Sequence, residues 1–400
     1  MNIDKLLYFI FDIINKALPF LMIPFITRHV SLGEYGNIEL FISIYVFFSF
    51  IISFAFEGWL SSNYFKTIKL SIYIKSYLLF VLYLSLLIFL FIFIYDSFLS
   101  LTIFIAFTNA ILFLVTTLLR LEGKFKYAGA ILLFNSVINV ITLYLFFILF
   151  EPTFQSRIYA LVLTYFITLS ILIYIIRIKY NHILLANAEL AAFKVIFLFC
   201  LPLCISMISS WIKGNIDKFY IGSLLSLNDL AIYSLGFQIS SVLGVITITI
   251  NKIIQPSFFY KMSNDLNTKG SIFLVILTII IGSIFYLFSI DYLFSFIFDD
   301  RYLPSMKLLP FFILSFTSSA IVMILNNYLM FHQKTKLIMY QVIISSFFHC
   351  IISFYLIHYF SIIGATIAQL ISSILSLLIT LFFLRKLKYA KLNINCNASL

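Results

Sequence analysis

Charged residues are scarce in this chain. Lys, Arg, Asp and Glu make up 10% of its 400 residues, whereas soluble domains carry about 25%. Hydrophobic residues make up 63%, and the mean hydropathy is +1.12. So few charges cannot keep the surface of a soluble domain hydrated. Because a helix satisfies its own backbone hydrogen bonds in lipid, we predict an all-α polytopic membrane protein.

Glycine and cysteine are also scarce, with 12 and 4 residues. The sequence contains no glycine-rich loop that would cradle a phosphate, which excludes ATP hydrolysis by a P-loop. Cys200 and Cys204 lie one helical turn apart in an apolar run, but no His or further Cys completes a metal site. We expect these two to be packing residues. We expect no metal, no cofactor and no disulfide framework.

Polar residues divide the chain into about 12 apolar runs, each near the roughly 20 residues that a spanning helix needs. The first run contains Asp12 and Lys16 and two prolines, so we interpret it as a retained helix and not as a cleaved signal peptide. The predicted spans are 6–27, 37–62, 77–95, 99–119, 128–149, 158–177, 193–213, 230–251, 271–290, 307–330, 338–358 and 361–384.

The basic residues follow the positive-inside rule if both termini are cytoplasmic. Nineteen of the 26 Lys and Arg then lie in cytoplasmic segments, six lie in outer segments, and Lys16 lies within a span. This asymmetry supports both the orientation and the number of spans. The net charge of +11 therefore reflects topology, and nucleic-acid binding is not needed to explain it.

The two halves of the sequence resemble each other. "SLGEYGNIEL" at residues 31–40 matches "SLNDLAIYSL" at residues 226–235, and "GKFKYA" at Gly123 matches "QKTKLI" at Gln333. The offset grows from 195 to 210, which indicates an insertion near "FDDRYLPSM". We predict a duplication with lobes 1–190 and 191–400. Six spans per lobe give parallel repeats, whose interface forms a central cavity typical of transporters.

Polar side chains follow some predicted spans and avoid others. The first, second, seventh and eighth spans carry polar stripes, which mark a face turned away from lipid. The third and ninth spans are almost wholly apolar, so we expect them to face lipid. The cavity-lining polar residues that we predict are Asn15, Gln238, Asn251 and Gln255.

Three acidic residues within or beside spans are candidates for ion coupling, namely Asp12, Glu57 and Asp217. Burial disfavours a carboxylate's charged form, which makes Glu57 a candidate proton or Na⁺ site. Alternatively, Glu57 reaches the headgroups at the cytoplasmic end of its span. Asp12 and Lys16, one turn apart, either neutralise each other or handle an ion or ligand. Asp217 with its basic neighbours is alternatively a solvated outer rim.

Three further polar side chains have a simpler interpretation. Asn135 and Asn139 share one face of a predicted span, and His349 occupies the matching place in the second half. We expect these side chains to make hydrogen bonds between helices.

Three stretches resemble Wzx-type polysaccharide flippases, a branch of the multidrug/oligosaccharidyl-lipid/polysaccharide exporter superfamily. They are "KALPFLMIPFITRHVSLGEYGNIEL" from Lys16, "WIKGNIDKFYIGSLLSLNDLAIYSLG" from Trp211, and "IIGATIAQLISS" from Ile362. The chain departs from the pattern at Leu230-Ala231, where many relatives have a glycine.

The resemblance implies two six-helix lobes around a cationic cavity in the bacterial inner membrane. The implied substrate is an undecaprenyl-diphosphate-linked oligosaccharide, such as an O-antigen repeat unit of lipopolysaccharide, driven by a H⁺ or Na⁺ gradient. Lys16, Arg28, Lys213 and Lys218 are the implied diphosphate ligands. The implied partners are membrane lipids, a polysaccharide polymerase and a chain-length regulator, with the chain itself a monomer and not an enzyme.

Three alternatives stay open at this stage. A drug or cation antiporter of the same superfamily would favour an acidic cavity, whereas the lining predicted here includes several lysines. An O-antigen polymerase is similar in length and composition, but it generally has a long outer loop and no repeated halves. A membrane-bound acyltransferase would need a His-centred constellation, and the five His residues are scattered along the sequence.

Overall fold

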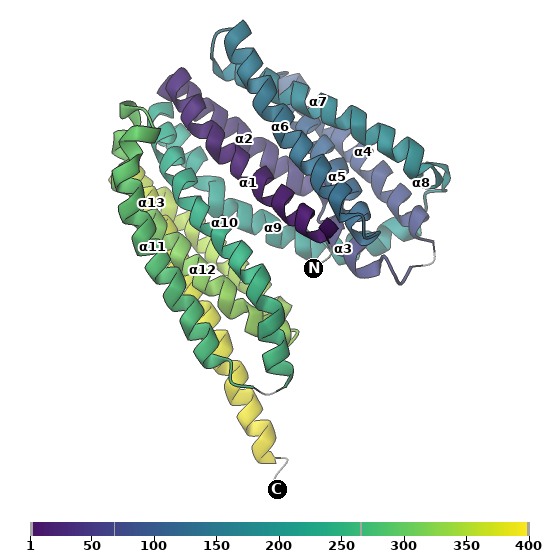
Figure 1. Ribbon diagram of the computed structural model, residues 1–400, viewed down its shortest axis with the longest axis vertical. Helices are drawn as coiled ribbons and strands as arrows, with labels where there is room; N and C mark the ends of the chain where they lie inside the picture. The colour runs from purple at the N-terminus through teal and green to yellow at the C-terminus, as the bar shows by residue number, and fades with distance from the viewer. Residues whose placement is uncertain (1–2, 68, 265, 398–400) are drawn as a thin grey trace. The chain divides into compact units, whose positions relative to one another are not determined.

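The computed structural model describes residues 3–67, 69–264 and 266–397, and these residues form helices and no strand. Eleven helices of this described part are long and apolar enough to cross a membrane. Figure 1 shows the arrangement of the helices along the chain. The prediction of an all-α polytopic membrane protein is confirmed.

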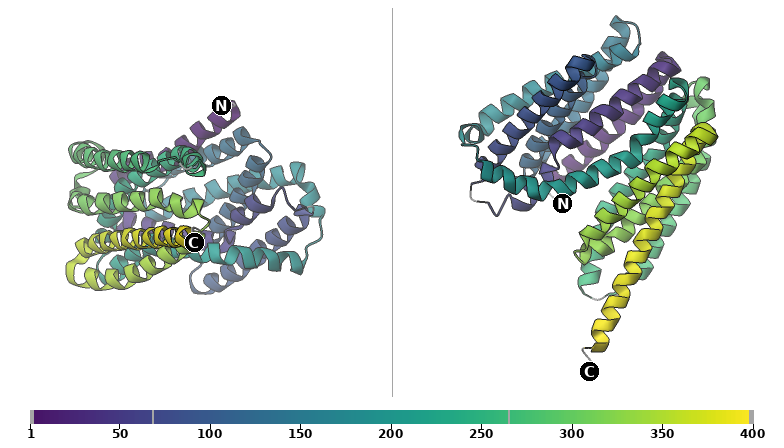
Figure 2. Two further views of the ribbon diagram at one scale, coloured as in Figure 1. Left: turned by 90° about the horizontal axis from the view of Figure 1, so that it is seen from below. Right: turned by 180° about the vertical axis from the view of Figure 1, so that it is seen from behind.

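The last of these helices, α13 (Thr335–Asn397), contains two spans. Ser361 has φ 54° and ψ −141°, which no helical residue adopts, so the backbone turns there. The two parts correspond to the predicted spans 338–358 and 361–384, and they raise the total in the described chain to the predicted twelve. The second part of α13, coloured yellow, is the last helix before the C-terminus (Figure 2).

The chain forms two compact units, residues 1–208 and 209–400. In the first unit α5 is the most deeply buried helix and packs against α2, α6 and α7, while α6 lies between α1 and α7 (Figure 1). The helices of this unit, the last of which continues into the second unit, are α1 (Ile3–His29), α2 (Leu32–Ser53), α3 (Phe56–Asn63), α4 (Leu70–Tyr95), α5 (Leu101–Leu121), α6 (Phe125–Leu149), α7 (Phe154–Lys179), α8 (Asn181–Leu185) and α9 (Leu190–Leu224).

In the second unit α12 packs against α10, α11 and α13. The stretch "FDDRYLPSM", near which the sequence predicts an insertion, forms most of the 3₁₀ helix η1, whose Tyr302 is fully buried. The helices of this unit, besides the end of α9 and α13, are α10 (Leu227–Ser263), α11 (Lys269–Ile297), η1 (Asp300–Leu308) and α12 (Leu309–Phe331).

The boundary between the units lies within α9, later than the predicted boundary between residues 190 and 191. The beginning of α9 packs into the core of the first unit, where Ile196, Cys200 and Cys204 are buried with residues of α4 and α5. This packing assigns the beginning of α9 to the first compact unit. The proposed lobes 1–190 and 191–400 concern the duplication, and they stay a prediction.

The repeated sequence stretches form matching helix starts. Ser31 caps α2 by accepting a hydrogen bond from the Glu34 amide, and Ser226 caps α10 by accepting one from the Asp229 amide. A serine followed three residues later by an acid is a typical N-terminal capping sequence. The matching serines of the two sequence stretches therefore perform the same function, which is to cap the helix that follows.

The third and ninth predicted spans are largely exposed, as a lipid-facing position requires, although α1 is equally exposed, and their contact with lipid stays a prediction. Few residues of α4 and of residues 270–290 in α11 are buried. Large apolar side chains such as Leu87, Ile94, Phe285 and Phe288 are exposed on these two helices. Exposed apolar surface of this kind is stable in a membrane protein because lipid tails cover it.

The predicted second span is broken where α2 ends and α3 begins. Phe54 and Ala55 have φ of 49° and 53°, a left-handed conformation that costs roughly 1–2 kcal/mol per residue outside glycine. Backbone carbonyls near such a break need other donors in lipid. The Tyr77 hydroxyl donates to the Ser53 carbonyl at 3.0 Å, and the Cys200 sulfur lies 3.9 Å from the Ala55 carbonyl oxygen.

The turn between the two parts of α13 predicts a strict requirement for Gly364. A Cβ added there would lie 1.9 Å from the Leu356 carbonyl oxygen. We expect Gly364→Ala to destabilise the protein by on the order of 3 kcal/mol, because backbone must move to relieve the contact. Thermal unfolding of the detergent-purified protein measures the effect. Gly282→Ala is the control, since a Cβ there meets no atom within 4 Å. Equal midpoints for both variants would contradict this account of the turn.

Candidate functional site

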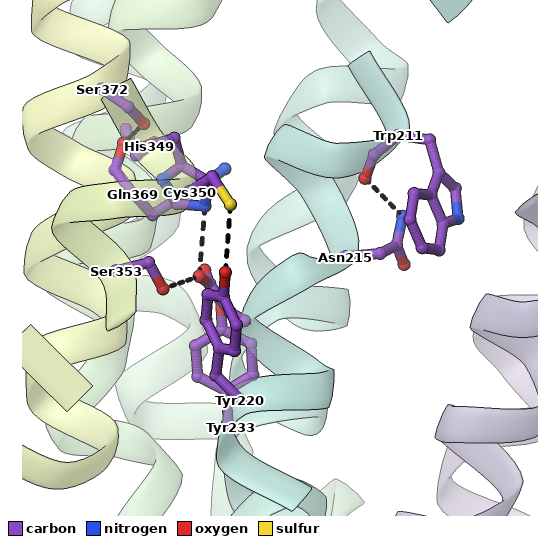
Figure 3. A network of polar contacts seen from close by, with 11 residues as sticks. Trp211, Asn215, Tyr220, Tyr233, His349, Cys350, Ser353, Gln369 and Ser372 are labelled. Carbon is purple, nitrogen blue, oxygen red and sulfur yellow. Dashed lines mark hydrogen bonds and ion pairs between the residues drawn. The ribbon is translucent and has the colours of Figure 1, made fainter. Parts of the chain in front are cut away.

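Asp217 of α9 is the most deeply buried acid among those of the second unit whose side chains the structure describes, with 1% of the residue exposed. The Tyr233 hydroxyl of α10 donates to its Oδ2 at 2.6 Å, and the Ser353 hydroxyl of α13 donates to its Oδ1. His349 Nε2 of α13 lies 3.1 Å from the same Oδ1 (Figure 3). Three helices therefore meet at one carboxylate.

Every partner of this carboxylate is itself shielded from solvent. Tyr233, His349 and Ser353 are each 0% exposed. Because a buried charge without compensation is costly, the carboxylate needs its two hydroxyl donors and the imidazole together. The site is therefore a buried pair of ionisable side chains held between α9, α10 and α13.

Other titratable groups lie on the same helices. The Tyr220 hydroxyl lies 3.0 Å from the Cys350 sulfur, and both residues flank the carboxylate network (Figure 3). Lys213 donates to the Ser376 hydroxyl at 2.8 Å and to the Ser372 carbonyl at 3.3 Å. The Lys218 ammonium lies 5.9 Å from the centre of the Phe237 ring, and the residue is 5% exposed. The predicted solvated outer rim is wrong for Asp217 and Lys218, because both are buried.

Glu57, in the first turn of α3, has a basic partner. Its Oε2 lies 3.5 Å from Arg120 Nη2 of α5 and 3.5 Å from the Thr117 hydroxyl. Arg120 also donates to that hydroxyl at 2.7 Å. The Glu57 side chain is 39% exposed, so this ion pair is partly open to its surroundings. It lies directly after the break at Phe54 and Ala55.

The polar residues of α1 divide into three environments. Lys16 Nζ lies 2.6 Å from Asp12 Oδ2, an ion pair that fits the mutual neutralisation expected as one alternative, while a role of this pair in ion or ligand handling stays a prediction. Asn15 accepts a hydrogen bond from the Ser136 hydroxyl of α6. Arg28 is exposed at the other end of the helix.

The predicted cavity-lining amides of α10 bond to α12. The Asn327 amide donates to Asn251 Oδ1 at 2.6 Å, and the Gln255 amide donates to Asn327 Oδ1 at 3.0 Å. Gln238, also on α10, is partly exposed. These bonds join two helices of one unit, and a cavity-lining role for Asn15, Gln238, Asn251 and Gln255 stays a prediction.

The expected hydrogen bonds between helices are confirmed for both asparagines of α6. Asn135 Oδ1 accepts from the Thr168 hydroxyl at 2.9 Å, and Asn139 Oδ1 accepts from Arg157 Nη1 at 2.8 Å. Both donors belong to α7. Arg157 is 5% exposed, so this basic residue lies within the helix bundle and not in the outer loop where its position in the sequence had placed it.

Sequence reasoning did not identify His349, Tyr233 and Ser353 as partners of Asp217. His349 and Ser353 are four residues apart, which places them on one face of a helix. Asp217 is the only acid between residues 190 and 224. The spacing of His349 and Ser353 and the rarity of acids around Asp217 could be seen in the sequence. The packing of α13 against α9, which brings these residues together, could not. The Glu57–Arg120 pair was missed for the same reason.

Comparison with known proteins agrees with this architecture. Protein 1 of the Lsg locus of Haemophilus influenzae is 23% identical over 346 residues, covering 84% of this chain and 86% of that protein. The solved structure of the lipid II flippase MurJ in an inward closed conformation matches with a TM-score of 0.74 at 14% identity, covering 95% of this chain and 87% of that one.

A multidrug resistance MATE family transporter of the MOP superfamily, solved in an inward-facing conformation, has a TM-score of 0.72 at 14% identity. That match covers 93% of this chain and 95% of the transporter. This chain therefore shares its fold with these two solved structures. The model of the polysaccharide biosynthesis protein family matches residues 4–260. This match covers more than half of the sequence, and the chain belongs to the polysaccharide biosynthesis protein family.

Proposed function

We propose that the protein is a flippase for an undecaprenyl-diphosphate-linked oligosaccharide. It moves this substrate from the cytoplasmic to the outer leaflet of the bacterial inner membrane. The family match over residues 4–260 carries the proposal, together with a fold of transporter type over most of the chain. A polysaccharide precursor must cross the membrane before it is polymerised outside, and a spanning transporter supplies that step.

The physical obstacle to this transfer is the polarity of the sugars and the diphosphate. Sugars and a diphosphate cannot enter hydrocarbon unless other polar groups replace their hydrogen bonds to water, whereas the apolar prenyl tail is stable in hydrocarbon. Two lobes that expose a hydrophilic cavity to each side in turn solve the problem. Lys16, Arg28, Lys213 and Lys218 are the proposed ligands of the diphosphate. A polymerase and a chain-length regulator are proposed partners, and an O-antigen unit is one proposed cargo.

We place the coupling of transport to a proton gradient at Asp217 and His349. The pair is neutral when it holds one proton and has a charge of −1 when it does not. Because α9 and α13 enclose it in this structure, the neutral state favours the packed arrangement of these helices. Loss of the proton then favours their separation. Asp12 and Glu57 are the further candidates, each with a basic partner.

The function itself is tested by complementation of a strain that lacks its polysaccharide flippase. We expect the chain to restore surface polysaccharide, because precursor then reaches the outer leaflet. Immunoblotting of surface polysaccharide measures the result, with the empty vector as control. Restored chain length without restored export would indicate a polymerase instead. Drug resistance without surface polysaccharide would indicate a drug antiporter.

Proton coupling is tested in proteoliposomes that contain the lipid-linked oligosaccharide. We expect wild-type flipping to respond to an imposed pH gradient, and Asp217→Asn to abolish that response, because the amide imitates the protonated carboxyl group. His349→Gln is expected to weaken the response in the same direction. Asp300→Asn is the matched control, since Asp300 is exposed at the start of η1. A normal pH response in Asp217→Asn, or dependence on Na⁺ alone, would contradict the assignment.

The proposed diphosphate ligands are tested by charge reversal. We expect Lys16→Glu and Lys213→Glu each to lower flipping at least tenfold, because a hydrogen bond to a charged group contributes about 1.5–3 kcal/mol. Lys307→Glu, exposed in η1, controls for a general loss of positive charge. Unchanged flipping in the Lys16 and Lys213 variants would exclude both residues as substrate ligands.

A further inference from the structure

A groove lies between α6 and α7 on the first unit, apart from the charged residues considered so far. Its volume is about 560 Å³, within the range of roughly 300–1,000 Å³ that ligand pockets have. Most of its lining is apolar, including Ala130, Phe134, Ile171 and Ile175. Tyr174 and Ile178 on its rim are each 66% exposed, so in a membrane the groove opens to lipid.

One end of the groove is cationic. Lys124 and Lys179 belong to its lining. Their ammonium groups lie 3.0 Å and 2.5 Å from the same oxygen, Glu122 Oε2. Two cations and one anion leave a net charge of +1. By the positive-inside rule this end of the groove lies at the cytoplasmic surface.

The carboxyl group of this cluster stays ionised at neutral pH. Burial raises the pKa of Glu122, but hydrogen bonds from Lys179 and Lys124 lower it more, and the pKa stays below its usual value. The carboxyl group is therefore ionised when the two lysines are charged. Lys179 also donates to the Tyr180 hydroxyl at 3.0 Å. The cluster is thus held in place at the end of the apolar groove.

We propose that this groove binds an anionic phospholipid of the cytoplasmic leaflet, with one acyl chain between α6 and α7 and the phosphodiester at Lys124 and Lys179. The net charge of +1 matches the single negative charge of a phosphodiester. A prenyl diphosphate carries more negative charge than this cluster compensates, so the substrate's headgroup fits less well. Tyr127, also in the lining, is a residue type typical of the headgroup level.

The first experiment uses the wild-type protein alone. Native mass spectrometry of the detergent-purified full chain, titrated with phosphatidylglycerol, phosphatidylcholine or undecaprenyl phosphate, measures bound lipid. We expect phosphatidylglycerol to bind at least several-fold more tightly than the zwitterionic lipid. We also expect the thermal midpoint of the protein to rise with the concentration of phosphatidylglycerol, because a ligand that binds the folded state stabilises that state. Equal binding of the first two lipids overturns the proposal, and tighter binding of the prenyl phosphate assigns the groove to the substrate's tail instead.

Two variants then test the two ends of the groove. Ala130→Phe fills the apolar part, and we expect it to abolish the specifically bound lipid. Lys124→Gln removes one cation, and we expect about fivefold weaker binding of phosphatidylglycerol, as for the loss of one surface cation. Ala191→Phe and Lys66→Gln are matched controls, because both residues are exposed elsewhere on the first unit.

The wild-type preference, measured first, does not depend on whether the variants fold, and thermal unfolding verifies the folding of each variant. Loss of binding in Ala130→Phe and Lys124→Gln, with both controls unchanged, supports the proposal. Loss in Ala130→Phe with full binding in Lys124→Gln overturns the headgroup site. An equal loss of lipid binding in the control variants and the test variants also overturns the proposal, since lipid would then bind over the whole lipid-facing surface and not in the groove.

Discussion

Hydrocarbon offers no hydrogen bonds, and this constraint governs the described structure. Every polar group at membrane depth must find its partner within the protein. The protein meets the constraint by pairing polar side chains across neighbouring helices, as in Asn139 with Arg157 and Asn327 with Asn251. Asp217 is the extreme case, because a carboxylate requires more compensation than an amide. Its position among Tyr233, Ser353 and His349 ties α9, α10 and α13 together.

The same constraint connects structure and proposed function. A group that is stable in the bundle in only one charge state also reports whether the bundle around it is closed. In the proposed mechanism Asp217 with His349 has this property, whereas the asparagine pairs cannot have it, because amides have no charge to change. Glu57 with Arg120 is intermediate, since the ion pair is partly exposed. Asp217 and its partners come from three helices, α9, α10 and α13, whereas Glu57 and Arg120 come from two, α3 and α5.

Much of the fold follows from the sequence alone. Apolar runs of about 20 residues and the basic residues between them predicted the twelve spans. These signals are local or periodic, so no tertiary information was needed. The turn at Ser361 was also predicted as a gap between two spans. The break at Phe54 and Ala55 was not, because neither residue is a glycine or proline and the left-handed conformation is imposed by packing.

The candidate site was predicted only in part. Asp217 and the pairing of Asp12 with Lys16 could be identified because acids are rare and four-residue spacing places side chains together. The partners of Asp217 come from α10 and α13, which are distant in sequence, and no pattern in α9 specifies them. A solvated outer rim was one of two interpretations of Lys218, and its burial excludes that one. Pairing of helices, and not their existence, was the missing information.

The interruption between α2 and α3 has a mechanical consequence. A continuous helix transmits rotation about its axis along its whole length. Two left-handed residues, with their neighbouring carbonyls bound by Tyr77 and contacted by Cys200, interrupt that continuity. The direction of the short segment bearing Glu57 is therefore set by its own packing, in which Phe56, Trp59 and Leu60 are buried, and not by the long apolar helix before it.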